Sequence, residues 1–156
     1  MRPFKADLHI HTLLSPCGSL EMSPAEIISV AKGKSLDMIA ISDHNSTLHS
    51  ELMVTLGREA GISVLRAAEV TSAEEVHSLV ILPDEAARII FQKWLEIHST
   101  HIPYDPLIFG DQVVLDRNEQ IISEIDYFLP AALDTPLDEV EREAHRLGAL
   151  FIPEHT

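Results

Sequence analysis

The order of hydrophobic and polar positions predicts strands that alternate with helices. Residues 4–12 (FKADLHIHT) alternate between polar and apolar side chains, as a half-buried strand does. Ser23-Pro24-Ala25-Glu26 has the spacing of a capped helix start with proline in the first turn, and predicts a helix to about Lys34. Further strands are predicted at 38–42, 62–70, 76–82 and 150–153, and further helices at 46–60, at 84–97 and from 135 onwards. This order is typical of an α/β fold with a largely parallel sheet or barrel.

One connection is too short for this alternation. Only residues 70–76 separate Glu69 from His77, whereas a helical crossover between parallel strands needs about a dozen residues or more. We therefore predict that the strands at 62–70 and 76–82 form an antiparallel hairpin. Such a hairpin places Glu69 and His77 at the same end of the sheet.

The composition narrows the class of protein. The chain has 156 residues, 46% of them hydrophobic, with 11 basic and 25 acidic side chains and a net charge of −14. We expect one folded domain over 1–156, and the negative charge disfavours binding to nucleic acid. No apolar run reaches the ~18 residues of a membrane span, the N-terminus does not resemble a signal peptide, and the single Cys17 cannot form an internal disulfide. A soluble cytoplasmic protein is expected.

The densest chemistry lies in the first predicted strand. Side chains alternate along a strand, so Asp7, His9 and His11 share one face. Two imidazoles on one face can reach a single divalent ion. The alternative is a polar strand face whose histidines are hydrogen-bonded and functionally silent.

The other predicted strands also carry metal-type ligands at their ends. Asp43 and His44 follow the second strand, Glu69 closes the third and His77 opens the fourth, and Glu154 and His155 follow the last. Open α/β sheets and barrels build their sites at such ends, so we expect these side chains to converge.

The remaining histidines and the cysteine have plainer interpretations. His49, His98, His101 and His145 fall in predicted helices or a loop, where surface positions or helix-dipole partners are expected. Cys17 lies in a turn just past the double-histidine strand. It is either a buried inert thiol or a soft metal ligand.

Five motifs in this order resemble the PHP (polymerase and histidinol phosphatase) family. They are DLHIHT, ISDHN, AAEV, EEVHSL and IPEHT. The resemblance implies a distorted (βα)7 barrel that holds two or three divalent ions (Zn, Mn or Fe) at its strand ends and hydrolyses phosphate esters.

Residue by residue, the resemblance implies a ligand set. It consists of His9 and His11 for a first metal, His77 and His155 for a second, His44 for a third, and Glu69 as the carboxylate that bridges two metals. Asp7 and Asp43 match aspartates beside the ligands that do not coordinate. Cys17 stands where many members have a histidine or aspartate ligand of the third metal, and Glu154 stands where a small residue is common.

The family's closing Asp-x-His motif is missing from this chain, which ends at Thr156. An α/β barrel also usually needs ~250 residues. We therefore expect a PHP-like domain with the C-terminal part of its barrel absent, either as a fragment or as a form that completes the barrel by self-association.

The resulting hypothesis is a metal-dependent phosphoesterase. A metal-bound water would attack a small phosphate ester of the histidinol-phosphate, nucleotide or bisphosphate type, and no protein nucleophile is assigned. The first alternative is a non-catalytic metal-binding module with a structural role. An amidohydrolase-type enzyme is disfavoured, because none of the lysines that could bridge its metals lies at a predicted strand end; they are Lys5, Lys32, Lys34 and Lys93.

Overall fold

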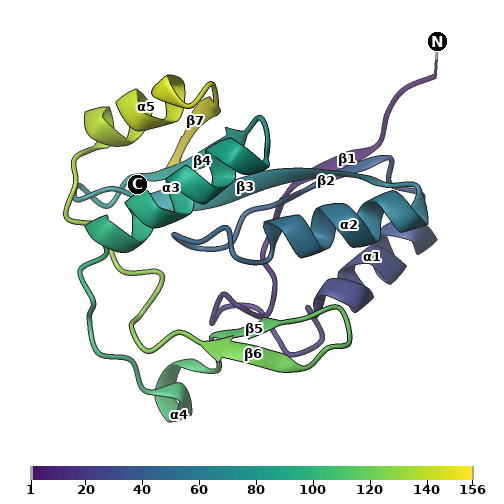
Figure 1. Cartoon of the computed structure of the whole chain (residues 1–156), viewed down its shortest axis with the longest axis horizontal. Coiled ribbons are helices and arrows are strands. Elements are labelled where there is room, and N and C mark those ends of the chain that lie inside the picture. The colour runs from purple at the N-terminus through teal and green to yellow at the C-terminus, as the bar shows by residue number, and fades with distance from the viewer. Residues whose placement is uncertain (1, 156) are drawn as a thin grey trace.

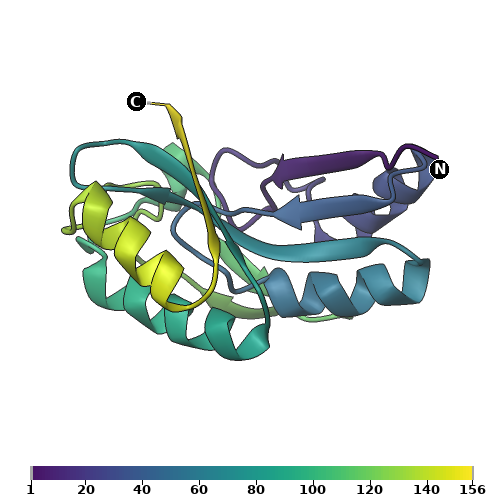
Figure 2. The same ribbon diagram turned by 90° about the horizontal axis from the view of Figure 1, so that it is seen from above.

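The core of the protein is one five-stranded mixed sheet. The computed structural model describes residues 2–155, with His155 described by its backbone alone. The strand order is β1 (Ala6–Ile10), β2 (Met38–Ile41), β3 (Ser63–Thr71), β4 (His77–Leu82) and β7 (Leu150–His155). β1, β2 and β3 run parallel, whereas the β3–β4 and β4–β7 pairs are antiparallel. β7 crosses the direction of β1 and β2 steeply, so the sheet is strongly curled (Figure 2).

The prediction of a (βα)7 barrel is wrong. The described residues form a curled half-barrel in which two of the four strand pairings are antiparallel. The physical reason is the short link between β3 and β4, which cannot hold a crossover helix and turns β4 back along β3. The predicted hairpin is thereby confirmed, with Thr71 paired to His77.

Five helices accompany the sheet within residues 2–155. They are α1 (Pro24–Gly33), α2 (Ser50–Ala60), α3 (Glu85–His98), α4 (Pro106–Phe109) and α5 (Leu137–Arg146). The Ser23 hydroxyl caps α1 by accepting from the backbone N–H of Glu26, and Asp84 caps α3. α2 begins at Ser50 rather than at 46, because residues 43–49 form a loop packed into the protein.

The long helices cover one face of the sheet (Figure 1). Ile39 and Ile41 of β2 pack with α1 and α2, and Val70 and Val80 pack with α3 and α5 around Phe91. The strand register puts all four of these β residues on the same face. The opposite face holds a small cluster from β2, β3 and β4 alone, and Glu69 lies on that side.

A separate hairpin supports the loop that follows β1. It pairs β5 (Val113–Leu115) with β6 (Ile121–Glu124) and lies apart from the main sheet (Figure 1). Leu13 packs against Val113 and Leu115, and Leu14 packs against Val114. The hairpin therefore fixes the start of the loop that carries Cys17. Within the described residues, none of the helices has the length and apolar character needed to cross a membrane.

Candidate metal centre

The predicted ligands that the structure describes converge at one end of the strands. The parallel strands β1, β2 and β3 finish at this end, β4 begins there, and β7 runs back to it. The side chains gathered in this way are His9, His11, His44, Glu69, His77 and Glu154.

Glu69 is the centre of the cluster. Its side chain is only 5% exposed, and its Oε2 lies 3.0 Å from Nε2 of His9 and 2.8 Å from Nε2 of His11. Nδ1 of His44 lies 3.5 Å from the same oxygen, and Nδ1 of His77 lies 2.5 Å from Oε1. Burial by itself raises the pKa of Glu69, but the contacts with these histidines outweigh it and hold that pKa well below its usual range.

The histidine rings are crowded around Glu69. Nε2 of His9 and Nε2 of His11 lie 3.0 Å apart, so only one of them can carry a proton between the two. Nδ1 of His44 is buried and makes no hydrogen bond of acceptable geometry. Two groups share Glu69: His9–His11–Glu69 and His44–Glu69–His77, and within each the ligand atoms lie no more than 4.8 Å apart.

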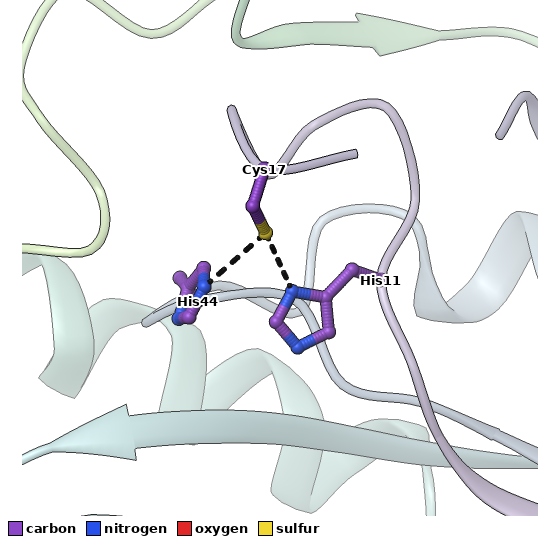
Figure 3. Close-up of side chains that lie close together, drawn as sticks. All are labelled: His11, Cys17 and His44. Atoms are coloured by element: carbon purple, nitrogen blue, oxygen red, sulfur yellow. Dashed lines mark hydrogen bonds between the residues drawn. The ribbon is translucent and has the colours of Figure 1, made fainter. Parts of the chain in front are cut away.

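Cys17 contacts two of these histidines, His11 and His44 (Figure 3). Its Sγ lies 3.1 Å from Nδ1 of His11 and 3.4 Å from Nε2 of His44. These contacts, of which the one with His11 has the larger effect, lower the pKa of the Cys17 thiol to about 6. Burial lowers the pKa of His11, but the contacts with Cys17 and Glu69 outweigh it and raise that pKa to about 10. His11, Cys17 and His44 thus form a third group of candidate ligands.

The turn that carries Cys17 depends on a glycine and on Asp43. A Cβ atom at Gly18 would come within 2.5 Å of the Thr12 carbonyl oxygen, so only glycine fits there. Asp43 is 1% exposed and accepts from the Thr12 backbone N–H, the Thr12 hydroxyl and the Ser15 hydroxyl at 2.7–2.8 Å. It therefore ties the β1 loop to the β2 loop. Asp7, by contrast, is exposed and contacts the backbone N–H of His9.

The expectation that His49 lies at the surface is wrong. His49 is fully buried, its Nδ1 lies 2.7 Å from the Thr12 hydroxyl, and its Nε2 accepts from the backbone N–H of Leu115 at 2.9 Å. Because Nε2 accepts, the proton is on Nδ1 and is donated to Thr12, which donates to Asp43. Burial lowers the pKa of His49, against the opposing charge of Asp43. The placement of His49 inside a predicted helix 46–60 concealed this role.

Glu154 is a site residue whose contact the sequence did not predict. Its Oε1 lies 2.9 Å from Nδ1 of His9, while its Oε2 is buried without a hydrogen-bond partner. The His155 backbone is paired with His77, but its side chain, a predicted ligand, lies outside the described part of the structure. The position of this acid directly before a predicted ligand was the available signal.

The other three histidines lie away from this centre. His98 contacts Asp134 at 2.8 Å, His101 lies against the Tyr127 ring, and His145 is exposed on α5. His101 and His145 are exposed, as predicted, whereas His98 is half-buried.

One curated relative is substantially similar in sequence. The uncharacterized protein MJ1587 of Methanocaldococcus jannaschii is 37% identical over 129 residues, which is 70% of this chain and 74% of that protein. No family model matches the chain.

Solved structures of other proteins share the fold. A Bifidobacterium adolescentis protein, assigned by inference as a metal-dependent phosphoesterase, matches 97% of this chain and 67% of its own with a TM-score of 0.69 at 16% identity. The lesion-specific endonuclease Q of Pyrococcus furiosus matches 96% of this chain with a TM-score of 0.62 at 20% identity, over 34% of its own length. An endonuclease Q bound to a 27-mer duplex with an abasic lesion has a TM-score of 0.61 at 21% identity, with 94% of this chain and 33% of that chain covered. At these identities the likeness shows the fold, which is that of PHP-type structures.

Proposed function

The chain belongs to the family of the Methanocaldococcus jannaschii protein MJ1587, and we propose that it is a metal-dependent phosphoesterase that hydrolyses a small phosphate ester. The observation that carries the proposal is the position of Glu69. Its carboxylate is shared by two groups of histidines at the ends of the parallel strands. A buried carboxylate between two such groups is the arrangement that two-metal hydrolytic sites use.

The donor set suits divalent ions of borderline softness. Imidazole nitrogens and a carboxylate suit Zn, Mn or Fe, and a thiolate adds a soft ligand. The buried Nδ1 of His44 and the buried Oε2 of Glu154, which have no hydrogen-bond partner, would gain one from an ion or its water. We propose two or three ions, with His9, His11 and His77 as ligands beside Glu69, and with His44, His155 and Cys17 completing the set.

The bound ions would neutralise phosphate charge and supply a hydroxide nucleophile near neutral pH. The chain's own residues orient the ligands. Oε1 of Glu154 lies 2.9 Å from Nδ1 of His9, while Nε2 of that ring faces Glu69. Asp43 fixes the two loops that carry His11 and His44. No serine or cysteine is assigned as a nucleophile.

Charge favours a small ester over a polynucleotide. The net charge is −14. Three of the arginines are already ion-paired with glutamates of α2 and α3; they are Arg66, Arg88 and Arg117. The phosphoesterase and the endonuclease among the structural neighbours both support cleavage of a phosphate–oxygen bond. The endonucleases, however, are about three times longer than the matched part, so their duplex substrate is not carried over.

The test compares wild-type protein with Glu69→Gln. Metal content and hydrolysis of a chromogenic phosphate ester are measured after loading with Mn²⁺ or Zn²⁺. We expect the variant to lose at least one equivalent of metal and about 100-fold or more in rate, because misplacing the reacting groups by about 1 Å can cost that much. His145→Ala, which alters an exposed histidine on α5, is the control and keeps both properties.

Metal binding without turnover in the wild type would contradict the proposal. It would favour the alternative of a metal-binding module whose ions hold the fold together.

A further inference from the structure

A hollow of about 720 Å³ adjoins the candidate metal centre on the side of β4. We name it the Phe128 hollow; its lining includes Thr71, Glu75, His77, Ile102, Phe128 and Leu133. His77 belongs both to this lining and to the Glu69 cluster, where its Nδ1 lies 2.5 Å from Glu69. A molecule in the hollow is therefore next to the metal centre.

The wall of the hollow is apolar, and neighbouring residues hold its side chains in place. Ile102 is 49% exposed, and the Phe128 ring packs against Phe109 with centroids 4.8 Å apart. The backbone N–H of Phe128 donates to the Ile102 carbonyl at 2.9 Å. The apolar wall is thus a preformed surface, which lowers the cost of ordering it on binding.

The polar groups of the lining do not suit an anion. Thr71 is 3% exposed, and its hydroxyl is buried without a hydrogen-bond partner. Glu75 brings a carboxylate to the rim. Among the described lining residues there is no lysine or arginine. A second phosphate or a carboxylate in the hollow would meet a like charge and no cation.

The hollow and the metal centre are tied together by Asn45. Its amide donates to the carbonyls of Leu129 and Ala131 at 2.8 and 2.9 Å, and its Oδ1 accepts from the backbone N–H of Thr71. Asn45 has a φ of +45° and directly follows His44. The wall at 129–131 therefore keeps a fixed position relative to the metal loop.

We propose that the Phe128 hollow binds the alcohol part of the phosphate ester, and that this alcohol carries an aromatic ring and no negative charge of its own. The inference rests on the proposed function and sharpens it from small phosphate esters in general to aromatic monophosphates. The ring lies on Phe128 and Ile102. Bisphosphates are excluded as substrates.

The test measures binding rather than turnover. Benzylphosphonate, ethylphosphonate and 2-carboxyethylphosphonate are titrated into the Mn²⁺-loaded full chain by calorimetry. Benzylphosphonate should bind at least about tenfold more tightly than ethylphosphonate, since removal of one apolar group from a fitted pocket costs that much or more. The carboxylate analogue should bind more weakly than ethylphosphonate.

Two phenylalanine variants provide the matched comparison. Phe128→Ala should remove the preference for the benzyl compound, whereas Phe4→Ala, at a residue that is 73% exposed, should keep it. Equal affinities for the benzyl and ethyl compounds, a preference that survives in Phe128→Ala, or no binding of either compound would overturn the inference. The proposed function is judged separately, by hydrolysis of ethyl phosphate, so the two can fail independently.

Discussion

Nδ1 of His9 lies 2.9 Å from Oε1 of Glu154, and this contact joins the two edge strands of the sheet, β1 and β7. In a flat five-stranded sheet the edge strands would be about 19 Å apart, at about 4.8 Å for each pairing. The sheet therefore curls until its edges meet over Glu69. The candidate metal centre closes the open side of the half-barrel.

Glu154→Ala should weaken metal binding. The substitution removes the carboxylate that lies 2.9 Å from Nδ1 of His9 and lets that ring rotate, and the loss of such a partner typically costs about 10–100-fold in metal affinity. Competitive titration with a chromogenic chelator measures the change. Glu141→Ala, at an exposed position on α5, is the control, and equal affinities in the two variants would rule out this role for Glu154.

Cys17 should react as a thiolate at low pH in metal-free protein. Its contacts with His11 and His44 lower its pKa from 9.0 to about 6, so the rate of alkylation should rise with a midpoint near pH 6. With metal bound the same thiol should be protected, because a coordinated thiolate is a poor nucleophile. Iodoacetamide kinetics before and after chelation give both results. A midpoint near pH 9, or rates unaffected by chelation, would contradict the expectation.

His49→Gln should destabilise the protein by about 2–4 kcal/mol. The variant disturbs the buried hydrogen bonds to Thr12 and Leu115 and leaves polar groups unpaired. Denaturant unfolding measures the loss, and His145→Ala should stay within about 0.5 kcal/mol of wild type.

The effect of His49 should also depend on pH. Burial lowers the pKa of His49 below its ordinary 6.5, so its stabilisation is present above that pH and is lost as the pH falls. The difference in unfolding free energy between wild type and His49→Gln should therefore shrink below pH 6.5. A difference that grows on acidification would show that His49 is charged in the folded protein.

Two glycine substitutions should have opposite effects. A Cβ at Gly57 would lie 2.3 Å from Cγ2 of Val64 and 2.8 Å from the Ile62 carbonyl oxygen, whereas a Cβ at Gly33 meets nothing within 4 Å. Gly57→Ala should cost about 1–3 kcal/mol through overpacking of α2 on β3. Gly33→Ala should be neutral or stabilise α1 by up to about 1 kcal/mol. Thermal unfolding of both variants tests the pair, and a tolerated Gly57→Ala would show that α2 can shift.

The sequence predicted the strands and helices better than the way in which they associate. Alternation at 4–12 and the Ser23 cap identified β1 and α1 correctly, and the short link after Glu69 correctly predicted an antiparallel hairpin. The curled half-barrel could not be predicted from the local sequence pattern, because the pairing of β7 with β4 depends on contacts between distant segments. The family resemblance favoured the wrong closure.

The candidate site shows the same division. The period-two spacing and the strand ends predicted that His9, His11 and Glu69 lie close together, and the structure places them in contact. Their roles as metal ligands stay predictions. His49 escaped notice because no local pattern reveals that the Leu115 backbone will come to lie beside it. Glu154 was expected among the converging strand-end side chains, but its contact with His9 was not predicted, since that partner is on the opposite edge strand of the sheet.

The β3–β4 hairpin also has a consequence for the order of assembly. Glu69 and His77 are eight positions apart and meet through a local turn, whereas His9 is sixty positions from Glu69. Short loops close at a smaller entropic cost and therefore sooner than long ones. A newly made chain can thus present a two-ligand chelate as soon as the hairpin has formed. The contact between His9 and Glu154 cannot form until β7 has joined the sheet. An ion bound early by the hairpin would therefore gain its remaining ligands only at the end of folding.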